Sequence, residues 1–132
     1  MVLIDNNISP RVAHAIHALT LPDDQVVALR EKFLANTTDE TWLHALGEEG
    51  GWTVISGDIR ITRQPSERRA WRQSRLKGFF LAPGWSRYTN LQRTARLLLW
   101  WPKFQAQERL VEPGAIFQVP INPSSKLTQL PM

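Results

Sequence analysis

The chain has 132 residues, 42% of them hydrophobic, with 6 Trp, which is enough for one domain with a buried core rather than a disordered chain. It has no cysteine, which excludes disulfides and thiolate-bound metals and fits a reducing compartment. No basic and apolar leader opens the sequence, and its longest apolar run, residues 97–101, is too short to span a bilayer. We therefore expect a single domain over residues 1–132, soluble and cytoplasmic, without membrane contact.

The net charge of +4 is unevenly distributed. Residues 60–77 carry seven basic residues and a single acid, Glu67, whereas residues 23–49 carry seven acids. An acidic centre beside a basic segment suits a phosphate-bearing polymer held at a metal site. The same charges also fit ordinary solvent-exposed helix faces, so composition alone leaves both interpretations open.

The N-terminal segment predicts a strand followed by a helix. Residues 2–5 form a short apolar run that predicts a strand ending at Asp5. Ser9 is a good N-cap residue and Pro10 suits the first helical position, so a helix is predicted over 10–20. A functional group at the end of such a strand lies where open α/β sheets place their ligands.

A second strand and helix follow. Residues 25–29 predict a strand, and after a turn a helix is expected over 38–49. Thr37 and Glu40 have the spacing of a capping box, and the glycines at 50–51 end the helix.

The C-terminal half continues the alternation, with strands over 52–56, 78–82 and 115–119 and helices over 66–76 and 90–110. Pro102 lacks a backbone donor and predicts a kink or break in the last helix. Residues 120–132, rich in Pro and Ser, predict an extended tail. About five strands joined by helices predict a mainly parallel sheet with helices on both faces, which is a three-layer α/β fold.

Three acids are candidate site residues. Asp5 ends the first strand, Asp58 follows the strand over 52–56, and Asp39 opens the helix between them. Parallel strands end at one edge of their sheet, so the three carboxylates can meet there and hold a hard divalent cation. Each acid also has a local explanation, since Asp favours turns and acids in a first helical turn complement the helix dipole. Capping accounts for Glu40 more fully than for Asp39.

Other site chemistries find little support. The three histidines lack a zinc-binding spacing, and the sequence has no phosphate-binding glycine loop, dinucleotide motif or nucleophile elbow. The tryptophans are expected mostly in the core, as for Trp42, Trp100 and Trp101. Trp85, within Pro-Gly-Trp-Ser, is the best candidate for an exposed ring that stacks on a base.

Several segments, taken in order, carry a resemblance to a known family: residues 3–11, 27–30, 39–43, 51–58, 79–81, 100–102 and 113–117. This set resembles the PIN-like branch of the PIN ribonuclease superfamily, which includes the toxins of virulence-associated B/C (VapBC-type) toxin–antitoxin modules. The resemblance covers nearly the whole chain and implies a divalent-metal-dependent endoribonuclease acting as such a toxin. It also implies two partners, an RNA substrate and a cognate antitoxin with a helix-turn-helix DNA-binding domain.

The resemblance assigns roles to the acids. Asp5, Asp39 and Asp58 match the positions that hold Mg²⁺ or Mn²⁺ and carry catalysis, and Glu40 is the neighbouring catalytic candidate. Many PIN nucleases have a fourth acid further along, but no Asp follows Asp58 here and Glu67 is the only nearby acid. One metal with help from arginine therefore stays open beside a two-metal site.

Basic residues are expected to hold the RNA. A metal ion would supply a water of lowered pKa and neutralise charge on the phosphate. Arg60 and Arg63 lie just beyond Asp58 and would clamp that phosphate, with Asn6 beside it. The alternative for this segment is a turn with a local ion pair. Residues further out would position the RNA backbone without reading its sequence: Arg68, Arg69 and Arg72.

Other families fit less well. A response-regulator receiver needs a Lys directly after its last strand, where this chain has none before Lys126. A haloacid-dehalogenase phosphatase needs an Asp two residues after the first, where this chain has Asn7. The serious alternative is a catalytically inactive PIN-like module that binds RNA or protein. The sequence leaves a homo-oligomer open.

Overall fold

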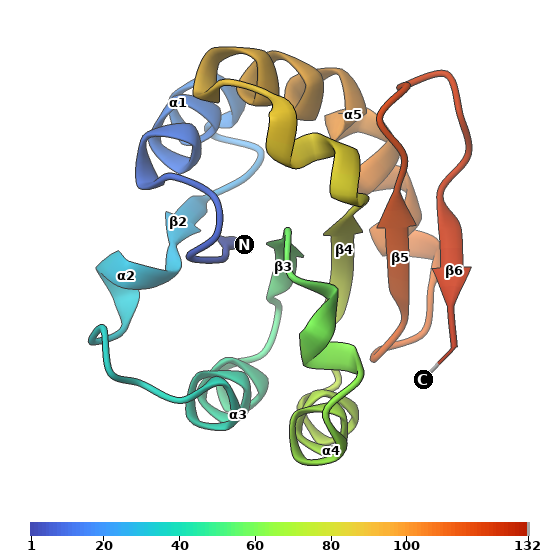
Figure 1. Ribbon diagram of the computed structural model, residues 1–132. Coiled ribbons are helices and arrows are strands. Elements are labelled where there is room, and N and C mark those ends of the chain that lie inside the picture. The colour runs from blue at the N-terminus through green and yellow to red at the C-terminus, as the bar shows by residue number, and fades with distance from the viewer. Residues whose placement is uncertain (132) are drawn as a thin grey trace.

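The computed structural model describes residues 1–131, except the side chains of Ile61 and Thr62. Its sheet has the strand order β2-β1-β3-β4-β5-β6 (Figure 1). The strands are β1 (Val2–Ile4), β2 (Val26–Ala28), β3 (Thr53–Ser56), β4 (Lys77–Leu81), β5 (Ile116–Val119) and β6 (Thr128–Leu130). The helices are α1 (Pro10–Thr20), α2 (Leu29–Lys32), α3 (Asp39–Glu49), α4 (Pro65–Ser74) and α5 (Asn90–Leu110), with short 3-10 helices η1 (Ile59–Thr62) and η2 (Pro83–Arg87).

All strands but the last are parallel, which confirms the expected mainly parallel α/β fold. β1 lies between β2 and β3, and β4 and β5 extend the sheet in the same direction. The sixth strand, β6, pairs antiparallel with β5 and was not predicted within the expected tail over 120–132. Its side chains are exposed or half-buried, so it shows none of the apolar pattern that reveals a strand in a sequence.

Helices cover both faces of the sheet, so the fold has three layers (Figure 1). Alternate strand residues face opposite sides, as the period of a strand requires. One face packs against α1 and α5 and includes Ile4, Ile55, Phe79 and Phe117. The other packs against α3 and α4 and includes Leu3, Val54, Phe80 and Ile116. Because both faces are buried, the strands read as continuous apolar runs.

Close packing between α4 and the sheet requires a glycine. A Cβ at Gly78 would lie 2.7 Å from the ring of Trp71, which is fully buried. The indole nitrogen of Trp71 donates to the carbonyl of Gly114 at 3.2 Å. This packing fixes α4 against β4 and thereby sets where the N-terminus of α4 lies relative to the sheet edge.

Several details of the helices differ from expectation. The N-cap of α3 is Thr38, whose hydroxyl accepts from the amide of Thr41 at 3.2 Å, so the predicted capping box of Thr37 and Glu40 is wrong. α4 ends at Ser74 rather than at 76 because Arg75 adopts a left-handed conformation with φ of 60°. α5 runs unbroken through Pro102, so of the predicted kink or break the break is wrong.

The continuity of α5 has a physical cause. Pro102 is exposed, while the neighbouring Trp100, Trp101 and Phe104 are buried in the core. Burial of these large rings outweighs the one backbone hydrogen bond that proline removes. The four-residue α2 was expected only as a turn. Within the described residues, no helix combines the length and the apolar character needed to cross a membrane.

Candidate active site

Two of the predicted acids lie at the same edge of the sheet. Asp5 directly follows β1, and Asp58 follows β3, the strand paired with β1. Ser56, the last residue of β3, connects them: its hydroxyl donates to Oδ2 of Asp5 at 2.8 Å and accepts from the amide of Asp58 at 3.0 Å. Ser56 is only 1% exposed, so its hydroxyl is held in place by the strand. Sequence reasoning missed this residue, although a polar side chain ending an apolar strand was a visible signal.

Asn7 connects the same two loops. Its side-chain oxygen accepts from the amide of Gly57 at 2.9 Å, and its amide nitrogen donates to the hydroxyl of Ser56 at 3.4 Å. The Ser56 hydroxyl thus donates once and accepts twice, which is its full capacity. Asn6, a predicted phosphate ligand, is exposed, and its backbone amide donates to Oδ1 of Asp5 at 2.6 Å. These bonds fix the direction of the Asp5 carboxylate.

Burial raises the pKa of Asp5, and the nearby charges of Asp39 and Asp58 raise it further. The hydrogen bonds from Ser56 and Asn6 act in the opposite direction and do not fully compensate. The ionised carboxylate is therefore unfavourable in this position. A cation bound beside it would offset both the cost of burying the charge and the repulsion from the neighbouring carboxylates.

Asp39 and Glu67 extend the acidic group onto the helices. Asp39 is the first residue of α3, and its Oδ1 accepts from the indole nitrogen of Trp42 at 2.9 Å. Burial raises the pKa of Glu67, as do the charges of Asp39, Asp58 and Glu40 and a hydrogen bond with Asp39. Glu67 thus supplies a fourth acid beside Asp39 and Asp58. The sequence showed it only as the single acid in a basic segment.

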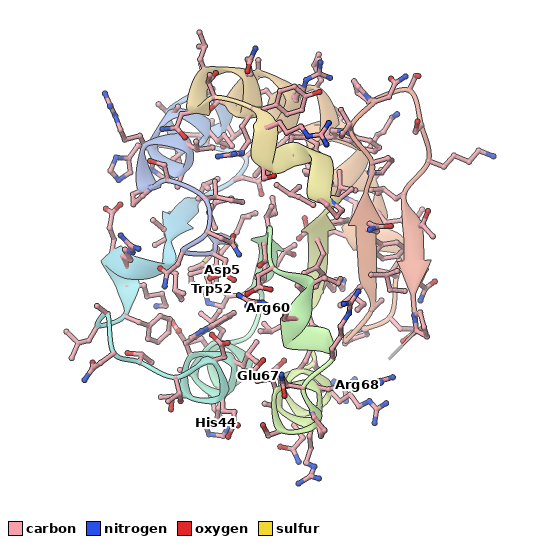
Figure 2. All side chains as sticks on the ribbon, viewed as in Figure 1. Asp5, His44, Trp52, Arg60, Glu67 and Arg68 are labelled. Carbon is pink, nitrogen blue, oxygen red and sulfur yellow. The ribbon has the colours of Figure 1, made fainter. Side chains whose placement is uncertain are left out.

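The helices carrying these acids pack closely. A Cβ at Gly47 of α3 would lie 2.9 Å from the backbone of Ser74 in α4, so only glycine fits. In Figure 2, Glu67 lies on the side of α4 that faces α3, and Arg68 lies on the other side. Glu40 faces a cavity of about 200 Å³ between the two helices, together with His44 and Arg69. Its charge acts on Glu67 and is not among the causes that shift Asp5.

Arg60 forms a salt bridge with Asp58. Its Nε and Nη2 donate to the two carboxylate oxygens of Asp58, each at 2.9 Å. These bonds, followed by other contacts with Arg60, lower the pKa of Asp58 despite partial burial. Arg60 is 78% exposed at its side chain, so solvent screens the pair. To clamp a phosphate, Arg60 would have to leave Asp58.

The remaining predicted basic residues differ in their exposure. Arg63 follows η1 and is exposed, as are Arg69 and Arg72 on α4. Arg68 is half-buried, and its Nε has no hydrogen-bond partner within the described part of the chain. Arg69 lines the cavity between α3 and α4 together with Glu40, whereas Arg68 lies on the side of α4 away from α3 (Figure 2).

Comparison with known proteins identifies the family. The family model described as "PIN like domain" matches residues 1–83. The chain belongs to the PIN-like domain family. No curated protein and no solved structure matches it. The matched segment contains β1 to β4 and every candidate acid, whereas α5, β5 and β6 lie beyond it.

The acids of this PIN-like domain form an open group. Among the described residues, no group of three or more His, Asp or Glu side chains is close enough to enclose a metal ion. The acids instead influence one another's pKa from four separate segments, namely the loop after β1, α3, the loop after β3, and α4.

Two further side-chain types have structural roles. His17 accepts from the amide of Val26 at 3.0 Å, and His14 pairs with Glu31, so each has a partner other than the candidate site acids. Trp85 is 2% exposed, and its indole nitrogen donates to the carbonyl of Val119 at 3.1 Å. The expectation that Trp85 offers an exposed ring is therefore wrong, because η2 folds the ring into the core.

Proposed function

We propose that this PIN-like domain is a divalent-metal-dependent endoribonuclease. The observation that carries the proposal is the acidic group at the sheet edge, in which Asp5 and Glu67 have raised pKa values partly because Asp39 and Asp58 are near. Mutually repelling, partly buried carboxylates reduce stability unless a cation joins them. Perturbed acids gathered in this way are typical of functional sites.

The donor set suits Mg²⁺ or Mn²⁺. Asp5, Asp39, Asp58 and Glu67 offer only oxygen ligands, which hard cations prefer. Mg²⁺ commonly keeps several of its own waters and takes few protein ligands, so it does not require all four carboxylates as direct ligands. When bound, such an ion supplies a water of lowered pKa and positive charge beside the scissile phosphate.

The chain's own residues prepare this site. Ser56 and Asn6 hold the Asp5 carboxylate in one direction, and the amide of Asp58 is tied to the same hydroxyl. Arg60 keeps Asp58 ionised, because it lowers the pKa of that carboxyl. If a cation takes its place on Asp58, Arg60 becomes available for the phosphate, which its guanidinium geometry matches.

The catalytic proposal is favoured over an inactive binding module. An inactive module has no need of coupled acids that destabilise the fold, and Arg60 pairs with only one of them. RNA as the substrate, and the toxin role with its antitoxin partner, rest on the resemblance of the sequence to toxin ribonucleases. The exposed arginines of α4 support a polyanionic substrate.

Cleavage of a labelled single-stranded RNA tests the activity. Asp58→Asn should abolish Mg²⁺-dependent cleavage, and chelation by EDTA should abolish it in the parent protein. Asp23→Asn is a matched control, since Asp23 is exposed and precedes β2, at the opposite edge of the sheet from Asp58. Equal cleavage by Asp58→Asn and the parent, in preparations free of contaminating nuclease, would show that Asp58 has no catalytic role.

Expression in a bacterial host tests the toxin role separately. Induction of the parent should arrest growth, and Asp58→Asn should not. Normal growth with a parent protein that cleaves RNA in vitro would support the nuclease activity and contradict the toxin role.

A further inference from the structure

Helix α5 has a second apolar face that nothing in the described structure covers. Its inner face buries Leu97, Trp100, Trp101 and Phe104 in the core. Its outer face carries six exposed residues at spacings of three and four: Leu91, Ala95, Leu99, Pro102, Ala106 and Leu110. We name these six residues the α5 stripe.

The α5 stripe is continuous and strongly exposed. At about 100° per residue, its members fall within about 100° of the helix circumference, opposite the buried face. Leu91 and Leu110 are each 81% exposed and Leu99 is 62% exposed. With a rise of about 1.5 Å per residue, the stripe extends for about 29 Å along the helix. Monomeric proteins rarely leave so long an apolar patch open to water, and such patches mark interaction sites.

The edges of the stripe are basic or neutral. Arg96 and Lys103 lie along one edge, where Arg96 stacks on Tyr88 and Lys103 lies over Trp100 and donates to the carbonyl of Pro123. Neither has an acidic partner within the described residues. The other edge carries neutral residues and Arg109, which borders a cavity shared with Asp23 and Asp24. The single acid of α5, Glu108, lies off the stripe, so the edge with Arg96 and Lys103 carries positive charge and no negative charge.

We propose that the α5 stripe binds an amphipathic helix of another protein, with an apolar face and acidic flanks. A second copy of this chain fits less well, because neither two-fold arrangement gives the basic edge an acidic partner. In an antiparallel pair, Arg96 and Lys103 would face their own copies, and like charges repel. In a parallel pair they would face the other edge, which carries neutral residues and Arg109.

The pattern of side-chain sizes also favours a helix as the partner. Small residues, Ala95 and Ala106, separate the large leucines and leave spaces that the leucines of a facing helix can fill. Helices that lie in membrane interfaces typically place Trp and Phe as well as Leu on the apolar face, whereas the α5 stripe has no aromatic residue. The stripe lies beyond the part of the chain that matches the PIN-like family and is independent of the proposed nuclease activity.

Binding of two synthetic helices tests the proposal. Both peptides have the length of α5 and leucines at spacings of three and four on one face, and their flanks carry glutamates in one and lysines in the other. Fluorescence anisotropy should show that the glutamate peptide binds at least about tenfold more tightly than the lysine peptide. Leu99→Gln should weaken this binding about tenfold, since a central apolar contact is lost. Its fold should be unchanged because Leu99 is 62% exposed.

Two variants act as controls. Leu34→Gln replaces a leucine that is 80% exposed but lies outside α5, and it should leave peptide binding unchanged. The double variant Arg96→Glu, Lys103→Glu should reverse the preference toward the lysine peptide. Equal binding of both peptides, or no effect of Leu99→Gln, would overturn the proposal. So would a dimer seen by light scattering, or sedimentation with vesicles of anionic phospholipid, if Leu99→Gln abolishes it.

Discussion

Replacing Ser56 with alanine removes one hydroxyl that serves three groups at the candidate site. The hydroxyl donates to the Asp5 carboxylate at 2.8 Å, and it accepts from the amide of Asp58 at 3.0 Å and from the side chain of Asn7 at 3.4 Å. A hydrogen bond to a charged group contributes about 1.5 to 3 kcal/mol, and Ser56 is buried, so water cannot replace it. Ser56→Ala should therefore lower the free energy of unfolding by about 1.5 to 3 kcal/mol.

This loss predicts a measurable change in melting temperature. An unfolding entropy of about 2.1 cal/mol/K per residue gives about 0.28 kcal/mol/K for 132 residues. The melting temperature of Ser56→Ala in EDTA should thus fall by about 5 to 11 °C. Because the bond from Ser56 lowers the pKa of Asp5, its removal should raise that pKa further and weaken Mg²⁺ binding.

Differential scanning calorimetry and a Mg²⁺ titration check both expectations. Ser124→Ala is the matched control, because Ser124 is exposed and bonds only to Asn122 within its own turn. An unchanged melting temperature together with unchanged Mg²⁺ affinity in Ser56→Ala would refute the role of the hydroxyl. A lower melting temperature with unchanged Mg²⁺ affinity would confine Ser56 to a structural role.

Three further predictions concern charged residues of the same site. The pKa of Asp5 is raised above 3.8, so its ionisation costs stability as the pH rises through the folded-state pKa. In EDTA, Asp5→Asn should therefore melt at a higher temperature than the parent at pH 7, and this advantage should vanish below pH 3.8. An equal difference in melting temperature at both pH values would contradict the cost assigned to burial and repulsion of the Asp5 charge. Arg60→Gln frees both carboxylate oxygens of Asp58. It should tighten Mg²⁺ binding, measured by titration, and slow RNA cleavage, measured by single-turnover kinetics. Weaker Mg²⁺ binding would mean that Arg60 orients Asp58 for the metal. Arg69→Ala should lower the salt dependence of RNA binding by about 0.7 in the log–log slope, and an unchanged slope would place the RNA elsewhere.

The local features of the fold could be predicted from the sequence because they depend on neighbouring residues. Ser9 and Pro10 are sufficient to begin α1 at Pro10, and the apolar run before Gly57 is sufficient to place β3. Alternation of such strands and helices also determined the α/β class and the parallel sheet. The positions of Asp5 and Asp58 at one edge followed from the same reasoning, since parallel strands share an edge.

What depends on contacts between distant residues was decided only by the tertiary structure. β6 has exposed or half-buried side chains and forms because it pairs with the free edge of β5, so no periodicity in the sequence predicts it. α5 continues through Pro102 because its buried rings hold both halves against the sheet, which local propensity does not include. Trp85 lies in a turn sequence typical of the surface, yet η2 folds it into the core.

The candidate site divides in the same way. The residue types and their order along the chain indicated the acids, whereas the close approach of α3 and α4 at Gly47 decided that Glu67 joins them. The sequence likewise placed Arg60 near Asp58 but left open whether it bonds a phosphate or the carboxylate. Only the turn into η1, which directs both side chains to the same side, decided that Arg60 holds the carboxylate, because hydrogen-bond geometry depends on orientation as well as on distance along the chain.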